Sequence, residues 1–192
     1  EFLQDSIVAS ATETYLIDES VSMPVVAVTV PPWYYKDILK AEPCKPDPCS
    51  NAKFWLDTAV AAHVEYFPQG SSSVEKGFEI DAEASIMGGY SRNQKKKSVS
   101  INMKKKLQKG HFRYPLFETR PYQKKFKGFI LRNNGNRFVS DYLEDAMGTS
   151  LLEGTQVDYQ RSRQVVVFYN GKYYGIHVVT EEIFEVVVKG NV

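Results

Sequence analysis

The pattern that most constrains the fold of this chain is a pair of strand-like segments joined by Asn170-Gly171. Residues 164–169 before this pair and residues 172–179 after it are rich in β-branched and aromatic side chains. Asn-Gly between two such segments is the strongest short-range signal of a hairpin, because both residues tolerate the positive φ of a type I′ turn. The sequence therefore predicts an antiparallel hairpin over residues 164–179.

Other segments predict further strands and one well-defined helix. Apolar and β-branched patterns favour strands at residues 23–30, 59–67, 78–87, 98–103 and 126–132, and a short helix at 33–41. Residues 140–153 place apolar side chains at helical spacing, so we expect Leu143, Met147 and Leu151 to face the sheet. The expected fold class is α+β, a mainly antiparallel sheet with one packed helix.

The composition fits a single domain. With 192 residues and 43% hydrophobic content, the chain can bury one substantial core. We treat residues 1–192 as one domain, with a weakly patterned lead-in over 1–20 and the main body over 21–192. No apolar run approaches the roughly 20 residues of a membrane span, and the N-terminus has no signal-peptide pattern, so neither feature is expected.

Charge is distributed very unevenly along the chain. Residues 90–137 contain 15 of the 24 Lys and Arg residues and a single acidic residue, Glu118, so this stretch carries +14. The rest of the chain carries −13, which the total of +1 conceals. Such polarity predicts an anionic partner, either a nucleotide or an acidic protein or other polyanion. No nucleic-acid motif accompanies the charge, and we do not expect nucleic acid as the partner.

Residues 88–98, Gly-Gly-Tyr-Ser-Arg-Asn-Gln-Lys-Lys-Lys-Ser, combine two glycines with clustered cations. Glycine lets the backbone approach a ligand closely, and turn amides with nearby cations can converge on a phosphate. The stretch therefore indicates an anion site. The alternative is a solvated, lysine-rich hairpin without a ligand.

The two cysteines, Cys44 and Cys49, lie in a loop that contains three prolines. We expect a local disulfide between them, with reduced surface thiols and half of a zinc site as the alternatives. A disulfide indicates an extracytoplasmic compartment.

No metal site is assigned from the sequence. The three histidines, His63, His111 and His177, are scattered and lack ligand spacing. An acidic cluster at residues 79–83 alternates along a predicted strand, and we interpret it as one solvated face of that strand.

Several segments together resemble the N-terminal part of CotH-type proteins, the spore-coat protein H kinase-like family, especially its secreted bacterial branch. In order and spacing they cover most of residues 20–185, and they are residues 22–26, 63–67, 86–92, 96–98, 114–117, 126–133, 141–145 and 168–176. The resemblance implies a kinase-like N-lobe with an N-terminal β extension, and ATP with Mg²⁺ as cofactors.

The resemblance also assigns roles to individual residues. The turn with Gly88, Gly89, Ser91 and Arg92 is expected to lie over the nucleotide phosphates, with Lys97 or its neighbour Lys96 as the phosphate-contacting lysine. A carboxylate of the 140–153 helix, Asp141, Glu144 or Asp145, is expected to pair with that lysine. Glu181 matches an acidic position near the interlobe hinge. For each carboxylate the ordinary alternative is a solvated surface charge.

Two departures from the family pattern limit the expected function. Thr180 occupies a position where family members usually carry Arg, and the sequence stops at Val192, before the lobe that would supply catalytic residues. We therefore expect a nucleotide-phosphate-binding half of a CotH-type kinase that is inactive alone, with its catalytic residues unknown. The alternative is a non-enzymatic secreted module that holds an acidic protein or polyanion. Either protein is expected to be extracellular or at the cell surface.

Overall fold

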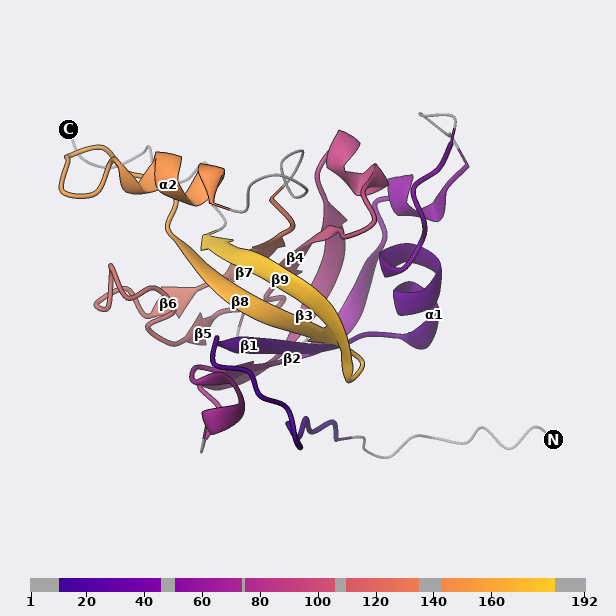
Figure 1. Cartoon of the computed structure of the whole chain (residues 1–192), viewed down its shortest axis with the longest axis horizontal. Helices are drawn as coiled ribbons and strands as arrows, with labels where there is room; N and C mark the ends of the chain where they lie inside the picture. Colours follow the sequence, from indigo (N-terminus) through magenta and orange to yellow (C-terminus); the bar gives the residue numbers. More distant parts are fainter. Residues whose placement is uncertain (1–10, 46–50, 74, 106–109, 135–142, 182–192) are drawn as a thin grey trace.

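Seven strands form a closed barrel in a computed structural model that describes residues 11–45, 51–73, 75–105, 110–134 and 143–181 (Figure 1). Their order around the barrel is β1-β2-β3-β4-β7-β9-β8. The strands are β1 (Val25–Thr29), β2 (Ala59–Phe67), β3 (Phe78–Met87), β4 (Ser98–Asn102), β7 (Gly128–Arg132), β8 (Ser162–Tyr169) and β9 (Lys172–Glu181). A separate two-stranded ribbon pairs β5 (Phe112–Arg113) with β6 (Lys125–Phe126).

The barrel is closed by the pairing of β1, its first strand in the sequence, with β8, its second-last. β1 pairs with β8 in parallel, with Val25 opposite Val166, while every other neighbouring pair in the barrel is antiparallel. Asn170 reinforces this seam, since its side-chain amide accepts from Val30 N at 2.8 Å and donates to Val30 O at 3.1 Å. The turn residue of the β8–β9 hairpin therefore also holds the chain in place at the end of β1.

Alternating side chains fill the interior, as the two-residue period of a strand requires. On β3 the inward positions are apolar and buried, whereas the outward positions from Glu79 to Ser85 are polar or charged, as in the sequence 78–83, Phe-Glu-Ile-Asp-Ala-Glu. On β2 the same alternation places Val60, Ala62 and Val64 inside and His63 and Glu65 outside. A smaller apolar cluster lies outside the barrel on β1 and β8, where Leu16, Val21 and Met23 of the N-terminal segment cover it. The described segment around Leu16 is thus packed against the barrel.

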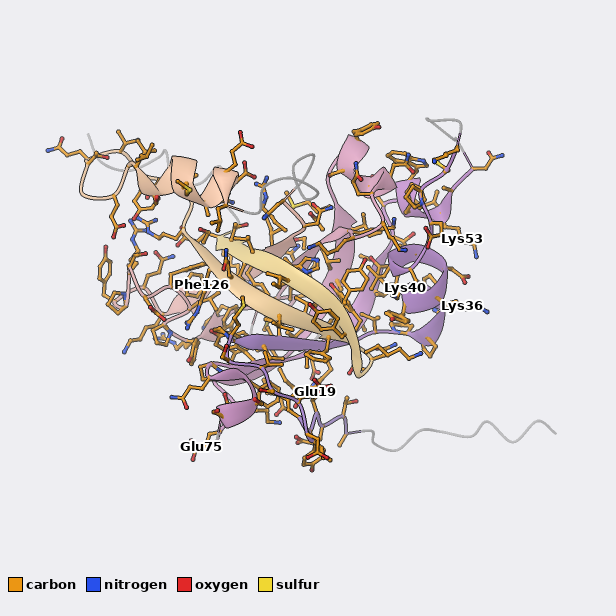
Figure 2. All side chains as sticks on the ribbon, viewed as in Figure 1. Glu19, Lys36, Lys40, Lys53, Glu75 and Phe126 are labelled. Atoms are coloured by element: carbon orange, nitrogen blue, oxygen red, sulfur yellow. The ribbon has the colours of Figure 1, made fainter. Side chains whose placement is uncertain are left out.

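The helices are short and lie at the rim. α1 (Pro32–Tyr34) starts with proline, which suits a first helical position, and a π-helical turn (Tyr35–Leu39) continues it. Single 3₁₀ turns occupy Lys53–Trp55, Gly70–Ser72 and Tyr90–Asn93. Figure 2 shows Lys36, Lys40 and Lys53 around α1, so basic side chains also gather outside the +14 stretch.

The predicted packed helix is wrong. α2 (Glu144–Ser150) has no buried residue, and Leu143, Met147 and Leu151 are 45%, 62% and 82% exposed. The fold class is therefore mostly β, a closed barrel with two short helices among the described residues, and not an α+β kinase-like N-lobe. Strand closure explains the difference, because a barrel covers its own apolar face and needs no helix to do so.

The strand predictions are confirmed. Each of the five predicted strands coincides with β1, β2, β3, β4 or β7, and the hairpin turns at Asn170 and Gly171, which have φ of 49° and 72°. No helix in the described part of the chain is long and apolar enough to cross a membrane.

Candidate functional site

The glycine turn (residues 88–97), the Asn133–Asn134 pair and the start of α2 lie at the same edge of the barrel, at the top of Figure 1. We call this region the upper edge. It is assembled by strand pairing, because β4 begins at Ser98 beside the end of β7, where Val99 is opposite Leu131. The segments that precede β4 and follow β7 therefore emerge together.

Gly88 is required by the shape of the turn. It has φ of +108°, and a Cβ added there would lie 2.2 Å from Ser91 Oγ, so a side chain is disfavoured by both strain and contact. Gly89 is different, because an added Cβ would meet nothing within 4 Å. The backbone at Gly89 is thus open to a close approach from solvent.

Arg92 ties the turn to the segment before β2. Its Nε donates to Gly88 O at 2.5 Å, and one terminal nitrogen donates to Trp55 O at 3.3 Å. The other terminal nitrogen pairs with Asp57 Oδ1 at 2.8 Å. Asp57 is 86% exposed, so it holds Arg92 from the solvent side.

Lys97 is completely buried, with 0% exposure. Its Nζ donates to Arg92 O at 3.1 Å and Gln94 O at 2.8 Å and lies 4.4 Å from the ring centre of Phe54. Desolvation lowers the pKa of Lys97 to about 8, because burial penalises the charged form. In this arrangement Lys97 fixes the glycine turn from its buried side, through the carbonyls of Arg92 and Gln94.

A buried network anchors the backbone of the lysine segment. Lys97 N donates to the Tyr174 hydroxyl at 3.1 Å, and that hydroxyl donates to Leu39 O at 2.9 Å. His177 Nε2 lies 3.2 Å from Lys97 O and Nδ1 lies 3.4 Å from Gly175 O. A neutral ring can donate to only one of these carbonyls, and the shorter contact favours the proton on Nε2. Burial lowers the pKa of His177 to about 4, which keeps the ring neutral near pH 7.

Lys96 and Asn133 connect the glycine turn to the neighbouring strands. Lys96 Nζ donates to Ile176 O at 2.6 Å, and Lys96 O accepts from Asn133 Nδ2 at 2.5 Å. The Asn133 backbone amide also donates to Ser98 Oγ at 3.0 Å. The turn, β9 and the end of β7 therefore form one hydrogen-bonded unit.

A polar cavity of about 150 Å³ lies beneath α2. Its wall includes Arg132, whose guanidinium pairs with Asp145 Oδ2 at 2.6 Å. It also includes Thr180, which is 5% exposed and whose Oγ1 has no hydrogen-bond partner among the described residues. A buried hydroxyl without a partner is costly, so the cavity offers an unused polar contact.

Glu181, at the end of β9, points to the other side of the strand from Thr180. Its Oε2 accepts from Arg161 NH1 at 3.1 Å and from Arg161 N at 3.3 Å. Both side chains are nearly buried, at 11% and 7% exposure. The second oxygen, Oε1, is buried without a hydrogen-bond partner within the described ranges.

The structure thus brings together most of the predicted turn residues. Gly88, Ser91, Arg92 and Lys97 meet in one turn, with Lys96 bonded to β9 and Gly89 exposed beside them. The expected pairing of a helix carboxylate with Lys96 or Lys97 is not seen among the described residues, since both ammonium groups donate to backbone carbonyls and Asp145 pairs with Arg132 instead. Glu144 is exposed on α2, and Asp141 lies outside the described residues.

Sequence reasoning missed Arg132, and it named Thr180 only as a departure from the family pattern and not as part of a site. Arg132 could have been found as the cation that ends a predicted strand, twelve residues before Glu144, where the acidic helix starts. Nothing in the sequence distinguishes the unpartnered hydroxyl of Thr180.

The cysteine prediction remains open. The Cys44 amide donates to Asn93 Oδ1 at 2.8 Å, which places the cysteine loop against the glycine turn. Cys49 lies outside the described residues, so the disulfide stays a prediction.

Two comparisons with known proteins bear on identity. No curated protein matches the sequence. The family profile described as CotH kinase protein matches residues 84–192. That match covers more than half of the chain and includes the whole upper edge, from the glycine turn to the end of β9. The chain therefore belongs to the CotH kinase family.

Proposed function

We propose that the upper edge binds the phosphates of a nucleotide, as the nucleotide-binding part of a CotH-type kinase, and that this chain alone does not transfer phosphate. The observation that carries the proposal is the ion pair between Arg132 on β7 and Asp145 on α2, at 2.6 Å, on the wall of a polar cavity. In protein kinases a strand lysine paired with a helix glutamate must be in place for phosphoryl transfer, and Arg132 with Asp145 offers a comparable cation–carboxylate pair on a different fold.

The glycine turn would cover the phosphates. Gly88 and Gly89 leave the backbone accessible, and Ser91 supplies a hydroxyl at the same turn. Arg92 keeps one guanidinium edge on the exposed Asp57, at 2.8 Å. Because the Asp57 side chain is 86% exposed, it can turn into solvent, and a phosphate can then take its place on Arg92.

The lysines would support the bound anion by different means. Lys97 fixes the turn through two carbonyls, and Lys96 holds it against β9. Lys95 is 75% exposed and lies 3.8 Å from the exposed Glu42, so it is the lysine most easily recruited by a ligand. Glu144, on the first turn of α2, would lie beside the phosphates, and Glu181 would lie at the end of β9.

ATP with Mg²⁺ is the cofactor pair that the family implies, and the residues at the upper edge fit its phosphates. The fit rests on the accessible glycines, the replaceable Asp57 and the unpartnered Thr180 hydroxyl. Bound Mg²⁺ would neutralise charge on the phosphate oxygens. The group that would orient an acceptor hydroxyl is not assigned to any described residue, which is why we expect binding without transfer.

The test is calorimetric titration of the 192-residue chain with Mg-ATP and with Mg-AMP. We expect saturable ATP binding that weakens at least tenfold in Arg132→Met and in Gly89→Val. Asp57→Asn should bind ATP more tightly, because it removes the carboxylate that competes for Arg92. Lys124→Met, an exposed lysine away from the upper edge, is the matched control and should leave affinity unchanged.

Two results would contradict the proposal. If Arg132→Met and Lys124→Met weaken ATP binding equally, the nucleotide is held by diffuse charge and not by this site. If the purified chain phosphorylates itself or an added acceptor protein, the expectation of binding without transfer is wrong.

A second candidate function is binding of an acidic protein or polyanion through the β5–β6 ribbon. On that ribbon Arg113 is directly opposite Lys125, and both are exposed, as are Lys124 and Lys127. Like charges directly opposite one another are destabilising, so an anionic partner would relieve the repulsion. Such binding should fall steeply with salt and weaken in Lys124→Met, the opposite of the result expected for ATP.

A further inference from the structure

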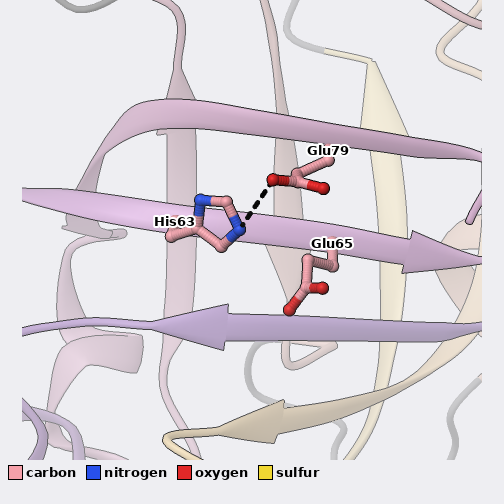
Figure 3. A group of neighbouring side chains, drawn as sticks. All are labelled: His63, Glu65 and Glu79. Carbon is pink, nitrogen blue, oxygen red and sulfur yellow. Dashed lines mark ion pairs between the residues drawn. The ribbon is translucent and has the colours of Figure 1, made fainter. Parts of the chain in front are cut away.

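A histidine and several carboxylates gather on the outer face of β2 and β3, away from the upper edge. The antiparallel register puts His63 opposite Asp81 and Glu65 opposite Glu79. All four are outward positions of their strands, so their side chains share one face. Figure 3 shows His63 and Glu65 on one strand and Glu79 on the next, with the His63 ring facing the Glu79 carboxylate and Glu65 beside them.

Asp81 fixes the orientation and tautomer of the His63 ring. Nδ1 lies 2.9 Å from Asp81 Oδ1, and because a carboxylate only accepts, Nδ1 carries the proton. In the neutral ring Nε2 then has a free lone pair. Histidines that bind metals usually donate their other ring N–H to a carboxylate in this way. The carboxylate orients the ring and makes the ligating nitrogen more basic.

The free nitrogen of His63 faces other electron-pair donors. Nε2 is buried, has no hydrogen-bond partner among the residues that the structure describes, and lies 3.5 Å from Glu79 Oε1. One ligand atom from each of His63, Glu65 and Glu79 lies within 4.8 Å of the others. Nε2 of the neutral ring and Glu79 Oε1 are both acceptors, and two acceptors this close together favour a cation between them.

The ammonium of Lys76 already marks this place as one that stabilises a cation. Nζ lies 2.6 Å from Glu13, 2.6 Å from Glu79 and 3.1 Å from Glu65. Side-chain hydrogen bonds to Glu13 and Glu79 raise the pKa of Lys76. Three carboxylates thus surround a single ammonium, and with Asp81 beside His63 the whole group carries a charge of −3 when His63 is neutral.

We propose that His63 Nε2, Glu65 and Glu79 bind a divalent transition-metal ion of the zinc type, which displaces the ammonium of Lys76. One imidazole and two carboxylates are ligands that Zn²⁺ accepts, and three protein ligands leave its fourth position open. Glu65 is 1% exposed and also accepts from Thr14 N at 3.2 Å, so it is a fixed ligand.

Glu13 is the candidate for the fourth position. It shares the Lys76 ammonium with Glu65 and Glu79 and comes from the N-terminal segment that covers the barrel. A cavity of about 620 Å³ beside the cluster is lined by Glu13, His63, Glu79 and Asp81, so an ion can enter from solvent. A bound metal would therefore fasten the N-terminal segment to β2 and β3.

The experiment uses the untagged 192-residue chain at pH 7, titrated with Zn²⁺ by calorimetry and with Co²⁺ by visible absorption. We expect one saturable site whose Co²⁺ spectrum shows ligand-field bands without a thiolate charge-transfer band. Lys76→Met should tighten Zn²⁺ binding at least tenfold, because the competing ammonium is gone. Asp81→Asn should weaken it by about 10- to 100-fold, the usual effect of losing such an orienting carboxylate.

His63→Asn should abolish the site, and His111→Asn is the matched control that should leave it intact. Circular dichroism of each variant confirms that the barrel is folded before titration. The proposal is overturned if neither the wild-type chain nor Lys76→Met binds Zn²⁺, or if His63→Asn binds it as tightly as the wild type. A cobalt–thiolate band would place the ion at the cysteines and would also overturn it.

Discussion

Lys97 and Lys76 show two opposite ways in which this barrel accommodates an ammonium. Lys97 is fully buried and donates only to carbonyls and an aromatic face, and its pKa is lowered to about 8 by desolvation. Lys76 is 25% exposed and surrounded by three carboxylates, and its pKa is raised by them. Pairing with carboxylates favours the charged form of Lys76, whereas burial disfavours the charged form of Lys97.

The difference indicates what each lysine does. A buried ammonium held by neutral oxygens costs stability in its charged form, and its geometry is fixed by its surroundings. Lys97 is therefore suited to shaping the glycine turn. The Lys76 ammonium is itself partly exposed, and two of its three carboxylates, Glu13 and Glu79, are exposed. It can therefore be exchanged for another cation, which is what the metal proposal at Lys76 requires.

The largest effect should follow from truncating the buried lysine. Lys97→Ala is expected to cost about 4 kcal/mol of unfolding free energy, because it leaves a cavity beside Phe54 and two carbonyls without their donor. Urea denaturation measures the loss. Lys95→Ala, at an exposed position in the same run of lysines, should change stability by less than about 0.5 kcal/mol, and equal losses would contradict the distinction.

Acid should destabilise the network beneath Lys97 through His177. The pKa of His177 is about 4 when folded and 6.5 when free, so between these values the unfolded chain binds a proton that the folded chain does not. Stability should therefore fall by about 3 kcal/mol as the pH drops from 6.5 to 4. His177→Gln keeps a donor but does not titrate, and its loss over this range should be smaller. Identical curves would refute the assignment.

Raising the pH should increase stability through Lys97, whereas lowering the pH should decrease stability through His177. Its pKa is about 8 in the folded chain and 10.5 when free, so above pH 8 the unfolded chain holds the extra proton. Stability should rise by about 2 kcal/mol from pH 8 to pH 10. Lys97→Met should remove this rise. The comparison stops at pH 10, because Tyr66, with a pKa of about 12 when folded, then contributes a fall.

The smallest effect is expected at the carboxylate-bound lysine. Lys76→Met should cost about 1 kcal/mol in metal-free buffer, and most of that cost should disappear in 1 M salt, which screens exposed charges. The cost of Lys97→Ala should be nearly independent of salt, because its ammonium is shielded from solvent. Matching salt dependences for the two variants would remove the contrast between the lysines.

The sequence predicted the strands well because their signals are local. The alternation along β2 and β3 and the Asn170-Gly171 turn depend only on neighbouring residues. Barrel closure could not be predicted, since the parallel pairing of β1 with β8 joins residues about 140 positions apart. The helix prediction failed for the same reason. Helical spacing at Leu143 and Met147 is real, but whether that face is buried depends on the rest of the barrel.

The candidate sites were predictable to different degrees. The glycine turn could be recognised because its residues are contiguous, and the structure brings most of them together. The role of Lys97 could not, because burial is a property of the fold. His63 and Glu79 were judged separately in the sequence, since their proximity arises only from cross-strand register. Spacing rules find ligands along one element and miss those on adjacent strands.

The closure of the barrel by β1 and β8 also bears on how the chain folds. β1 is complete at Thr29, yet one of its two neighbours is not reached until residue 166. Contacts so distant in sequence form late, because the entropy of closing the intervening loop must be lost first. During synthesis one edge of β1 therefore stays open until most of the chain has been made. The outer apolar face of β1 can be covered earlier, because the segment around Leu16, Val21 and Met23 is already present when β1 appears.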